Sequence, residues 1–226
     1  MRSMKEDNKP IDIPMLMPER LVDVDVVVWD MDGSLYRHDG ERGTFKESSL
    51  ERAVTRSAIR FIMDREGIDE VTAMTFYEET LLDEVGTSRV LAARYGITRK
   101  EYFDVVWDLD PKGIVRDFEI PKRVVKKFAE LGKQQILLTA APEAWQKRVL
   151  SFLEIEEMFF RRYNAEMFGK KDEVFADLAR EFNPARVLSI GDQIHSDIAP
   201  AFAVGLRVFH VSHPQALLTL MGGEST

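Results

Sequence analysis

Two carboxylates stand close together where an apolar stretch ends. Asp30 and Asp32 directly follow the β-branched run at 24–29, and Gly33 comes next. A run of this kind that stops at a glycine turn is typical of a buried strand. In such a position one carboxylate could attack a phosphoryl or carbon centre while the other transfers protons, with a divalent cation offsetting the negative charge. A simple aspartate-rich turn is at least as common for an isolated Asp-x-Asp-Gly.

A second acidic loop, at 191–197, also follows an apolar run. It contains Asp192 and Asp197, and each acidic loop alone could cap the start of a helix. Two such loops at equivalent strand ends favour a joint chemical site. His195 lies in the same loop, but no second histidine stands at the spacing of a metal ligand pair, so we expect it to face solvent.

Two further polar positions could complete a phosphate site. Thr139 ends the run at 136–138, where its hydroxyl and the following amides could bind phosphate oxygens or cap the helix that Pro142 begins. Lys170 and Lys171 precede another helix. An ammonium there could neutralise both a carboxylate and a phosphate, although a single lysine is more often a solvated surface residue.

Apolar patterning predicts the elements that hold these residues. Strands are expected over 24–29, 135–138, 187–190 and 206–209, with a short one possible at 158–160. Helices are expected over 50–62, 70–83, 88–95, from Thr98 onward, from Pro121 to Gly132, from Pro142 onward, over 172–182 and over 196–204. Strands that alternate with helices indicate a parallel sheet covered on both faces, whose ligands bind beyond the carboxyl ends of the strands.

The helices between the first and second strands have no strand among them. We therefore expect an inserted small helical domain, or cap, over residues 41–110, and a catalytic core over 21–40 and 111–226. Residues 1–20 are expected to form a flexible leader. The fold class predicted is α/β, a Rossmann-like parallel sheet with helices on both faces and an inserted α-helical cap.

Composition excludes several classes of function. The 226 residues are 45% hydrophobic, contain no cysteine and carry a net charge of −8. Thiolate metal sites and cysteine nucleophiles are thus impossible, and a metal held by carboxylates favours magnesium. The acidic balance predicts no nucleic-acid polymer and no membrane as partner, and the lack of a long apolar run or secretory signal predicts a cytoplasmic protein.

Taken together, these motifs resemble those of the haloacid dehalogenase-like hydrolase superfamily. The resemblance covers 24–211 and lies in the segments 30–35, 137–139, 169–170 and 191–197, in the family's order. It implies a Rossmann-like core with a helical cap. It also implies roles by position: Asp30 as nucleophile, Asp32 as acid/base, Thr139 as phosphate anchor and Lys170 as neutralising cation. The metal ligands implied are Asp30, Asp32 and Asp192 for Mg²⁺, with Asp197 as a supporting acid.

A finer resemblance points to the pyrimidine 5′-nucleotidase branch of that superfamily. It lies in 32–36, in 86–89 and in Thr139 with the helix after it. Ala140 stands where that branch commonly has asparagine, and Lys171 where the superfamily often has proline. Lys170 is preferred as the cation because it directly follows Gly169.

The resemblance implies a magnesium-dependent phosphatase that hydrolyses a small-molecule phosphate ester, a nucleoside 5′-monophosphate being one candidate, through an aspartyl-phosphate. A dehalogenase would have no alcohol to protonate, and Asp32 argues against it. A phosphomutase would keep every core residue and stays open, as does a binding protein that retains the fold without catalysis.

Overall fold

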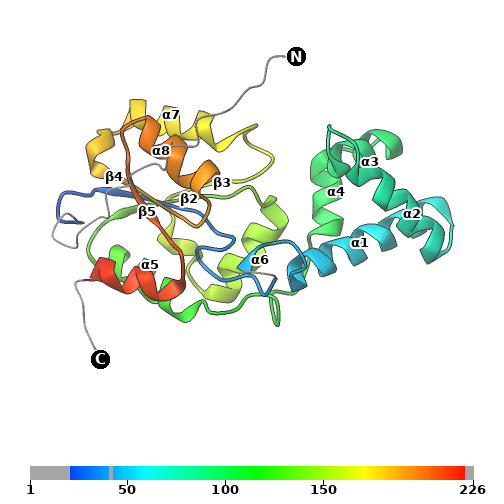
Figure 1. The fold of residues 1–226 in the computed structure, drawn as a ribbon, viewed down its shortest axis with the longest axis horizontal. Coiled ribbons are helices and arrows are strands. Elements are labelled where there is room, and N and C mark those ends of the chain that lie inside the picture. The colour runs from blue at the N-terminus through cyan, green and yellow to red at the C-terminus, as the bar shows by residue number, and fades with distance from the viewer. Residues whose placement is uncertain (1–20, 41–42, 222–226) are drawn as a thin grey trace, which may run out of the picture.

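The computed structural model describes residues 21–40 and 43–221, and the predicted leader at 1–20 lies outside this part of the chain. Its centre is a parallel five-stranded sheet in the order β3-β2-β1-β4-β5 (Figure 1). The strands are β1 (Val26–Trp29), β2 (Gln134–Leu138), β3 (Arg161–Tyr163), β4 (Val187–Gly191) and β5 (Arg207–His210). Because β1 pairs with both β2 and β4, the loops after these three strands meet at one edge of the sheet.

Helices cover both faces of this sheet, as the sequence pattern predicts. On one face lie α5 (Glu119–Glu130), α6 (Glu143–Leu153) and the 3₁₀ helix Pro214–Met221, and on the other lie α7 (Lys171–Glu181) and α8 (Ala199–Ala203) (Figure 1). Alternate residues of β1 enter the two cores: Val27 and Trp29 pack on the α5–α6 side, Val26 and Val28 on the α7–α8 side.

Four helices between β1 and α5 pack on one another beyond the end of the sheet (Figure 1). They are α1 (Ser49–Glu66), α2 (Glu70–Leu81), α3 (Thr87–Tyr95) and α4 (Arg99–Val106), and we call them the helical block. Their ends follow local rules. Gly67 and Gly96 end α1 and α3 in the left-handed conformation, and Thr98 and Glu101 form the capping box that their spacing predicts.

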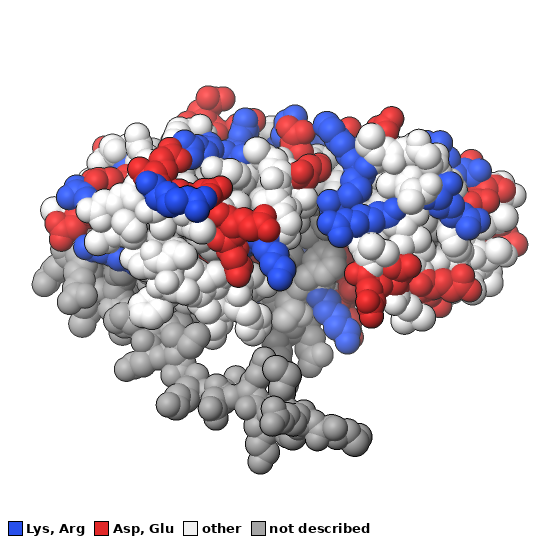
Figure 2. Space-filling view, turned by 90° about the horizontal axis from the view of Figure 1, so that it is seen from above, with Lys and Arg blue, Asp and Glu red and all other residues white. Residues whose placement is uncertain are grey.

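Ion pairs join α4 and the segment that follows it to α6 of the sheet-bearing part. Arg148 of α6 binds Asp108 at 2.6 Å, and Lys100 of α4 lies 3.6 Å from Glu143 of α6. Basic and acidic side chains alternate over both parts on the face shown in Figure 2. Within the described residues, no helix combines the length and apolar character needed to cross a membrane.

Two predicted elements differ from those observed. The segment 158–160 is not a strand: Glu156–Met158 is a 3₁₀ helix, and β3 begins three residues later, at Arg161. Phe159 is buried in the core, where its hydrophobicity reflects packing and not strand pairing. The predicted helix at 196–204 starts earlier, because a π-helical turn at Ile194–Ile198 leads into α8.

Candidate active site

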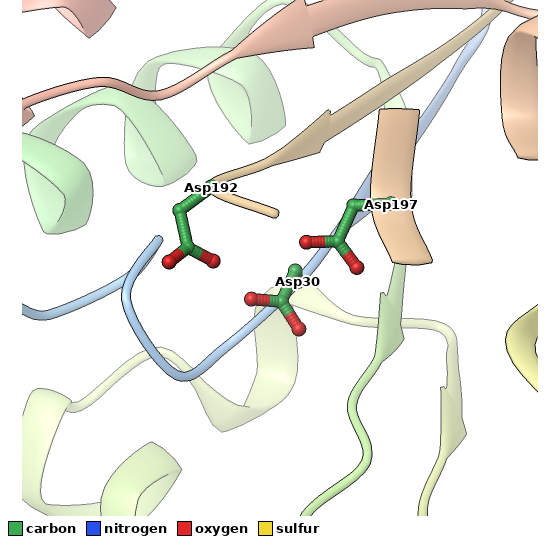
Figure 3. Close-up of side chains that lie close together, drawn as sticks. All are labelled: Asp30, Asp192 and Asp197. Atoms are coloured by element: carbon green, nitrogen blue, oxygen red, sulfur yellow. The ribbon is translucent and has the colours of Figure 1, made fainter. Parts of the chain in front are cut away.

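Three carboxylates converge at the carboxyl ends of β1 and β4 (Figure 3). Asp30 follows β1, Asp192 follows β4, and Asp197 lies in the π-helical turn after it. One oxygen from each of the three lies within 4.8 Å of the others. The two acidic loops identified in the sequence therefore form one cluster, because their strands are neighbours in the sheet.

Lys171, the first residue of α7, lies inside this cluster. Its Nζ donates to Asp30 Oδ1 at 2.7 Å and to Asp197 Oδ1 at 2.6 Å, and its side chain is only 8% exposed. Ser34 donates to the second oxygen of Asp30 at 3.1 Å. A buried ammonium between two carboxylates is fixed in position by both of them.

The cluster carries more negative than positive charge. With all three carboxylates ionised, the single ammonium leaves two negative charges at a site where Asp30 and Asp197 are buried and Asp192 is partly buried. Burial, only partly offset by Lys171, raises the pKa of Asp30 well above its usual value, and burial and Asp197 raise that of Asp192 to about 6. Burial alone would lower the pKa of Lys171, but Asp30 and Asp197 outweigh it and hold that pKa above its usual range.

A divalent cation fits this cluster. Its two positive charges would balance the excess, and carboxylate oxygens are the ligands that magnesium prefers. Asp192 Oδ1 is buried and has no hydrogen-bond partner, so an acceptor there is unsatisfied. Among the described residues, Asp30, Asp192 and Asp197 are the one set of histidine and carboxylate side chains close enough to share an ion.

Two glycines allow the loops to approach this closely. A Cβ on Gly33 would lie 2.3 Å from Asp192 Oδ2, and a Cβ on Gly191 would lie 2.3 Å from the Asp197 Cβ. Gly33 also has φ of +91°, a conformation that other residues rarely adopt. The glycine after Asp32 therefore serves the contact between the two loops and not only a turn.

Asp32 is held by a separate set of donors. Thr139 Oγ1 donates to Asp32 Oδ2 at 3.0 Å, and Trp145 Nε1 donates to Asp32 Oδ1 at 3.2 Å and to the Tyr36 hydroxyl at 3.0 Å. The Tyr36 hydroxyl itself donates to Asp32 Oδ1. Thr139 is fully buried and also accepts from the amide of Ala141 at 3.0 Å, so its hydroxyl bridges Asp32 and the loop after β2.

The structure places two predicted site residues outside the carboxylate cluster. Lys171, and not Lys170, reaches Asp30: Lys170 precedes α7 and is exposed, whereas Lys171 opens the helix on its buried side. In the carboxylate cluster the third side chain is Asp197 and not Asp32, because the carboxylate of Asp32 faces Tyr36, Thr139 and Trp145.

Sequence reasoning missed Tyr36 and Trp145 at this site. The two residues are 109 positions apart, and nothing in either segment indicates that their polar ends would meet on Asp32. The position of Lys171 can be predicted from the sequence. The apolar periodicity of the helix directs its first residue toward the core, whereas the residue before the helix does not share that periodicity.

Comparisons with known proteins agree with this architecture. The family model of haloacid dehalogenase-like hydrolases matches residues 24–205, which is most of the chain. The protein therefore belongs to the haloacid dehalogenase-like hydrolase family, and the family resemblance seen in its motifs is confirmed. A search of curated protein sequences finds no match.

Several solved structures share the fold at low identity. A predicted phosphoglycolate phosphatase from Haemophilus somnus 129PT superimposes with a TM-score of 0.54 at 16% identity, over 83% of this chain and 85% of that one. A haloacid dehalogenase-like family hydrolase from Xanthomonas campestris gives 0.51 at 14%, over 88% and 95%. A predicted phosphatase from Clostridium acetobutylicum gives 0.50 at 17%, over 84% and 86%. These likenesses confirm the predicted α/β fold class.

Proposed function

We propose that this hydrolase is a magnesium-dependent phosphatase that cleaves a small phosphomonoester through an aspartyl-phosphate. The observation that carries the proposal is the contact of Asp30 with Lys171 beside the unsatisfied Asp192. A carboxylate fixed by an ammonium, in a cluster that could also hold a divalent cation, suits attack on an anionic phosphoryl group.

The first half-reaction uses Asp30 as nucleophile. A carboxylate oxygen of Asp30 forms a bond to phosphorus while the bond from phosphorus to the ester oxygen breaks, and Asp32 gives a proton to the departing alkoxide. Lys171 stays protonated beside Asp30 and stabilises the charge on the phosphoryl oxygens. Oδ1 of Asp32 accepts from Tyr36 and Trp145, whereas Oδ2 accepts from Thr139 alone, so the second lone pair of Oδ2 can carry the proton while all three contacts stay in place.

The second half-reaction returns the nucleophile. Asp32, now ionised, takes a proton from water as the water oxygen bonds to phosphorus, and the bond between phosphorus and Asp30 breaks. Inorganic phosphate leaves, Asp30 is a carboxylate again and Asp32 is protonated for the next cycle. The donors from Tyr36, Thr139 and Trp145 keep the Asp32 carboxylate in one orientation through both steps.

Asp30, Asp192 and Asp197 would hold the magnesium ion. The bound cation would neutralise phosphoryl oxygens and so reduce the repulsion between an anionic substrate and Asp30. With the ion bound, Asp30 would have two positive partners, Lys171 and the cation, in its buried position.

We propose that residues 41–110 act as the cap that selects the substrate, as the sequence indicates. The chemistry above acts only on the phosphoryl group, so discrimination must come from groups outside the cluster. Ala140 lines the pocket that contains Asp30, Asp32 and Lys171, where a methyl group offers no hydrogen bond to a pyrimidine base. A pyrimidine 5′-monophosphate would therefore lack a contact at this position, and it is one candidate among several small phosphate esters.

A phosphate-release panel tests the proposal. Pyrimidine monophosphates, sugar phosphates and p-nitrophenyl phosphate are assayed with Mg²⁺ and with excess chelator, beside Asp192→Asn. Turnover should need the cation, and Asp192→Asn should raise the Mg²⁺ concentration for half-maximal activity. Full turnover in chelator would contradict the magnesium requirement, and no phosphate release from any ester would contradict the phosphatase itself.

The acid role of Asp32 is tested with two classes of ester. Asp32→Asn should lower turnover of an alkyl phosphate by about 10²–10⁴-fold, the usual range for general acid catalysis, and that of an aryl phosphate by less. An aryl leaving group needs little protonation. Equal losses on both would show that Asp32 does not protonate the alcohol.

A further inference from the structure

All four histidines of the chain line one pocket. The pocket has a volume of about 490 Å³ and lies between the segment after β1 and the loops after β4 and β5. Its basic side chains come from three separate parts of the sequence: Arg37, His38, His195, His210 and His213. Asp192 is the one acidic side chain among the described residues of its wall, in a chain with 39 aspartates and glutamates against 31 lysines and arginines.

This pocket adjoins the candidate active site. Gly33 and Asp192 belong to its wall: Gly33 lies in the loop after β1, which carries Asp30, and Asp192 lies in the loop after β4 and is part of the carboxylate cluster. Gln193 and His195 line this pocket and also the one that contains Asp30, Asp32 and Lys171. The loop after β4 is therefore a wall common to the two pockets.

The imidazoles are not arranged around a metal ion. No group that includes a histidine among the described residues brings its ligand atoms close enough to share one cation. Two of the four have their tautomers indicated by contacts. His210 Nε2 donates to the carbonyl of Asp192 at 2.9 Å, and His213 Nδ1 accepts from the amide of Ala216 at 3.2 Å, which leaves the Nε2–H of a neutral His213 as a donor.

Two further observations indicate a site built for a polar ligand. His38 is 8% exposed, and its Nδ1 has no hydrogen-bond partner, which is costly in a protein interior. The Arg37 guanidinium packs on Gly43, where a Cβ would lie 2.9 Å from Nε and 3.1 Å from Nη2. Gly43 has φ of +77°, so glycine suits that position in both conformation and space.

We propose that this histidine pocket binds a second acidic group of the substrate, so that the preferred phosphomonoester also carries a carboxylate or a second phosphate. The inference rests on the proposed phosphatase function. Arg37 supplies the permanent charge, and the imidazole N–H groups of His195 and His213 supply additional donors. The carboxylate of Asp192 is directed toward Asp30 and Asp197 (Figure 3), where the proposed magnesium ion would reduce its repulsion of the acidic group.

The first test measures binding without turnover. Calorimetry in Mg²⁺ compares ω-phosphonocarboxylates of increasing chain length with alkylphosphonates of the same length, and bisphosphonates of those lengths with both. At the best length the doubly acidic ligand should bind at least about tenfold more tightly than its alkyl partner, as expected for hydrogen bonds to a charged group. The tighter of carboxylate and phosphonate identifies the second group.

Variants assign that preference to the pocket. Arg37→Gln should reduce it about tenfold and leave the affinity for the alkylphosphonate within about threefold. Arg116→Gln is the matched control: Arg37 donates its amide to the Arg116 carbonyl, yet the Arg116 side chain is exposed and lies outside the pocket wall. His213→Gln provides a second pocket variant, with a smaller loss.

The outcomes separate the pocket from the chemistry. Equal binding of doubly acidic and alkyl ligands at every length would overturn the proposal, as would a preference unchanged in both Arg37→Gln and His213→Gln. Hydrolysis of alkyl phosphates and p-nitrophenyl phosphate is measured in parallel. Acid preference without hydrolysis of any ester would support the pocket and contradict the phosphatase, whereas hydrolysis without acid preference would do the reverse.

Discussion

The carboxylate cluster and the helical block are stabilised in opposite ways. In the cluster, Asp30, Asp197 and Lys171 are buried and Lys171 contacts both carboxylates, so each charge depends on its neighbours. In the helical block the charged side chains pair at the surface, as Arg94 does with Glu66, while apolar helix faces fill the interior. The cluster should therefore respond sharply to a single substitution, and the helical block should respond by small increments.

Removing the nucleophile should give the largest effect. Asp30→Asn keeps the shape of the side chain but replaces a nucleophilic carboxylate with an amide, so turnover should fall by at least about 10⁴-fold. Lys171 keeps Asp197 as a partner, and the fold should persist by circular dichroism. Asp104→Asn, which removes a carboxylate from an exposed ion pair of the helical block, is the control and should keep full activity. A comparable loss of turnover in Asp30→Asn and Asp104→Asn would contradict the expected difference between the carboxylate cluster and the helical block.

The two adjacent lysines offer a direct test of burial. Lys171→Met leaves Asp30 and Asp197 without their ammonium and should lower the free energy of unfolding by about 3–5 kcal/mol, the usual cost of breaking a buried pair. Lys170→Met changes an exposed side chain and should cost no more than about 0.5 kcal/mol. Urea denaturation of both variants measures the difference, and added Mg²⁺ should recover part of the loss in Lys171→Met. Equal free energies of unfolding for the two variants would show that the buried ion pairs of Lys171 do not contribute to stability.

The two lysines also show which features of the fold and site can be predicted from the sequence and which cannot. The strands, the helical insertion and the convergence of Asp30 with Asp192 follow from apolar periodicity and from the rule that parallel strands end at one edge. The choice between Lys170 and Lys171 depends on which residue faces inward at the start of α7, and one position along a helix turns a side chain by about 100°. Position next to Gly169 is therefore a weaker criterion for choosing the lysine than the direction of its side chain on the helix.

The neighbours of Asp32 were beyond prediction for a different reason. Tyr36 and Trp145 meet because α6 packs against the loop after β1, and that packing is set by the whole core. Their rings alone would indicate only buried hydrophobic residues. The prediction of a strand at 158–160 is wrong for a related reason. The hydrophobic Phe159 suggests a strand from the sequence, but in the structure it packs in the core just after a 3₁₀ helix.

Tyr36→Phe tests whether the Tyr36 hydroxyl positions the Asp32 carboxylate, and its expected effect is smaller than that of Asp30→Asn. The change removes the hydroxyl that donates to Asp32 and accepts from Trp145 and leaves the ring in place. Turnover of an alkyl phosphate should fall about tenfold or more, since hydrogen bonds to charged groups contribute about 1.5–3 kcal/mol. An aryl phosphate should lose less, because Asp32 matters less to its departure. Tyr102→Phe, a buried tyrosine of the helical block, is the control. An equal loss on both ester classes would indicate a structural effect and not one on Asp32.

The smallest effect should come from the helical block itself. Thr98 caps α4, and its hydroxyl accepts from the amide of Glu101 at 3.1 Å, so Thr98→Ala should cost about 1 kcal/mol of stability, the usual loss for such a cap. The capping box lies outside the carboxylate cluster, and kcat for p-nitrophenyl phosphate should stay unchanged. Thr98→Ser keeps the hydroxyl and should restore most of the stability, which separates the hydrogen bond from the lost methyl group. A large fall in kcat for Thr98→Ala with unchanged stability would show that α4 takes part in the chemical step. Such a result would mean that the helical block and the carboxylate cluster are coupled in catalysis. The two regions would then differ in how they are stabilised but not in whether they affect the reaction.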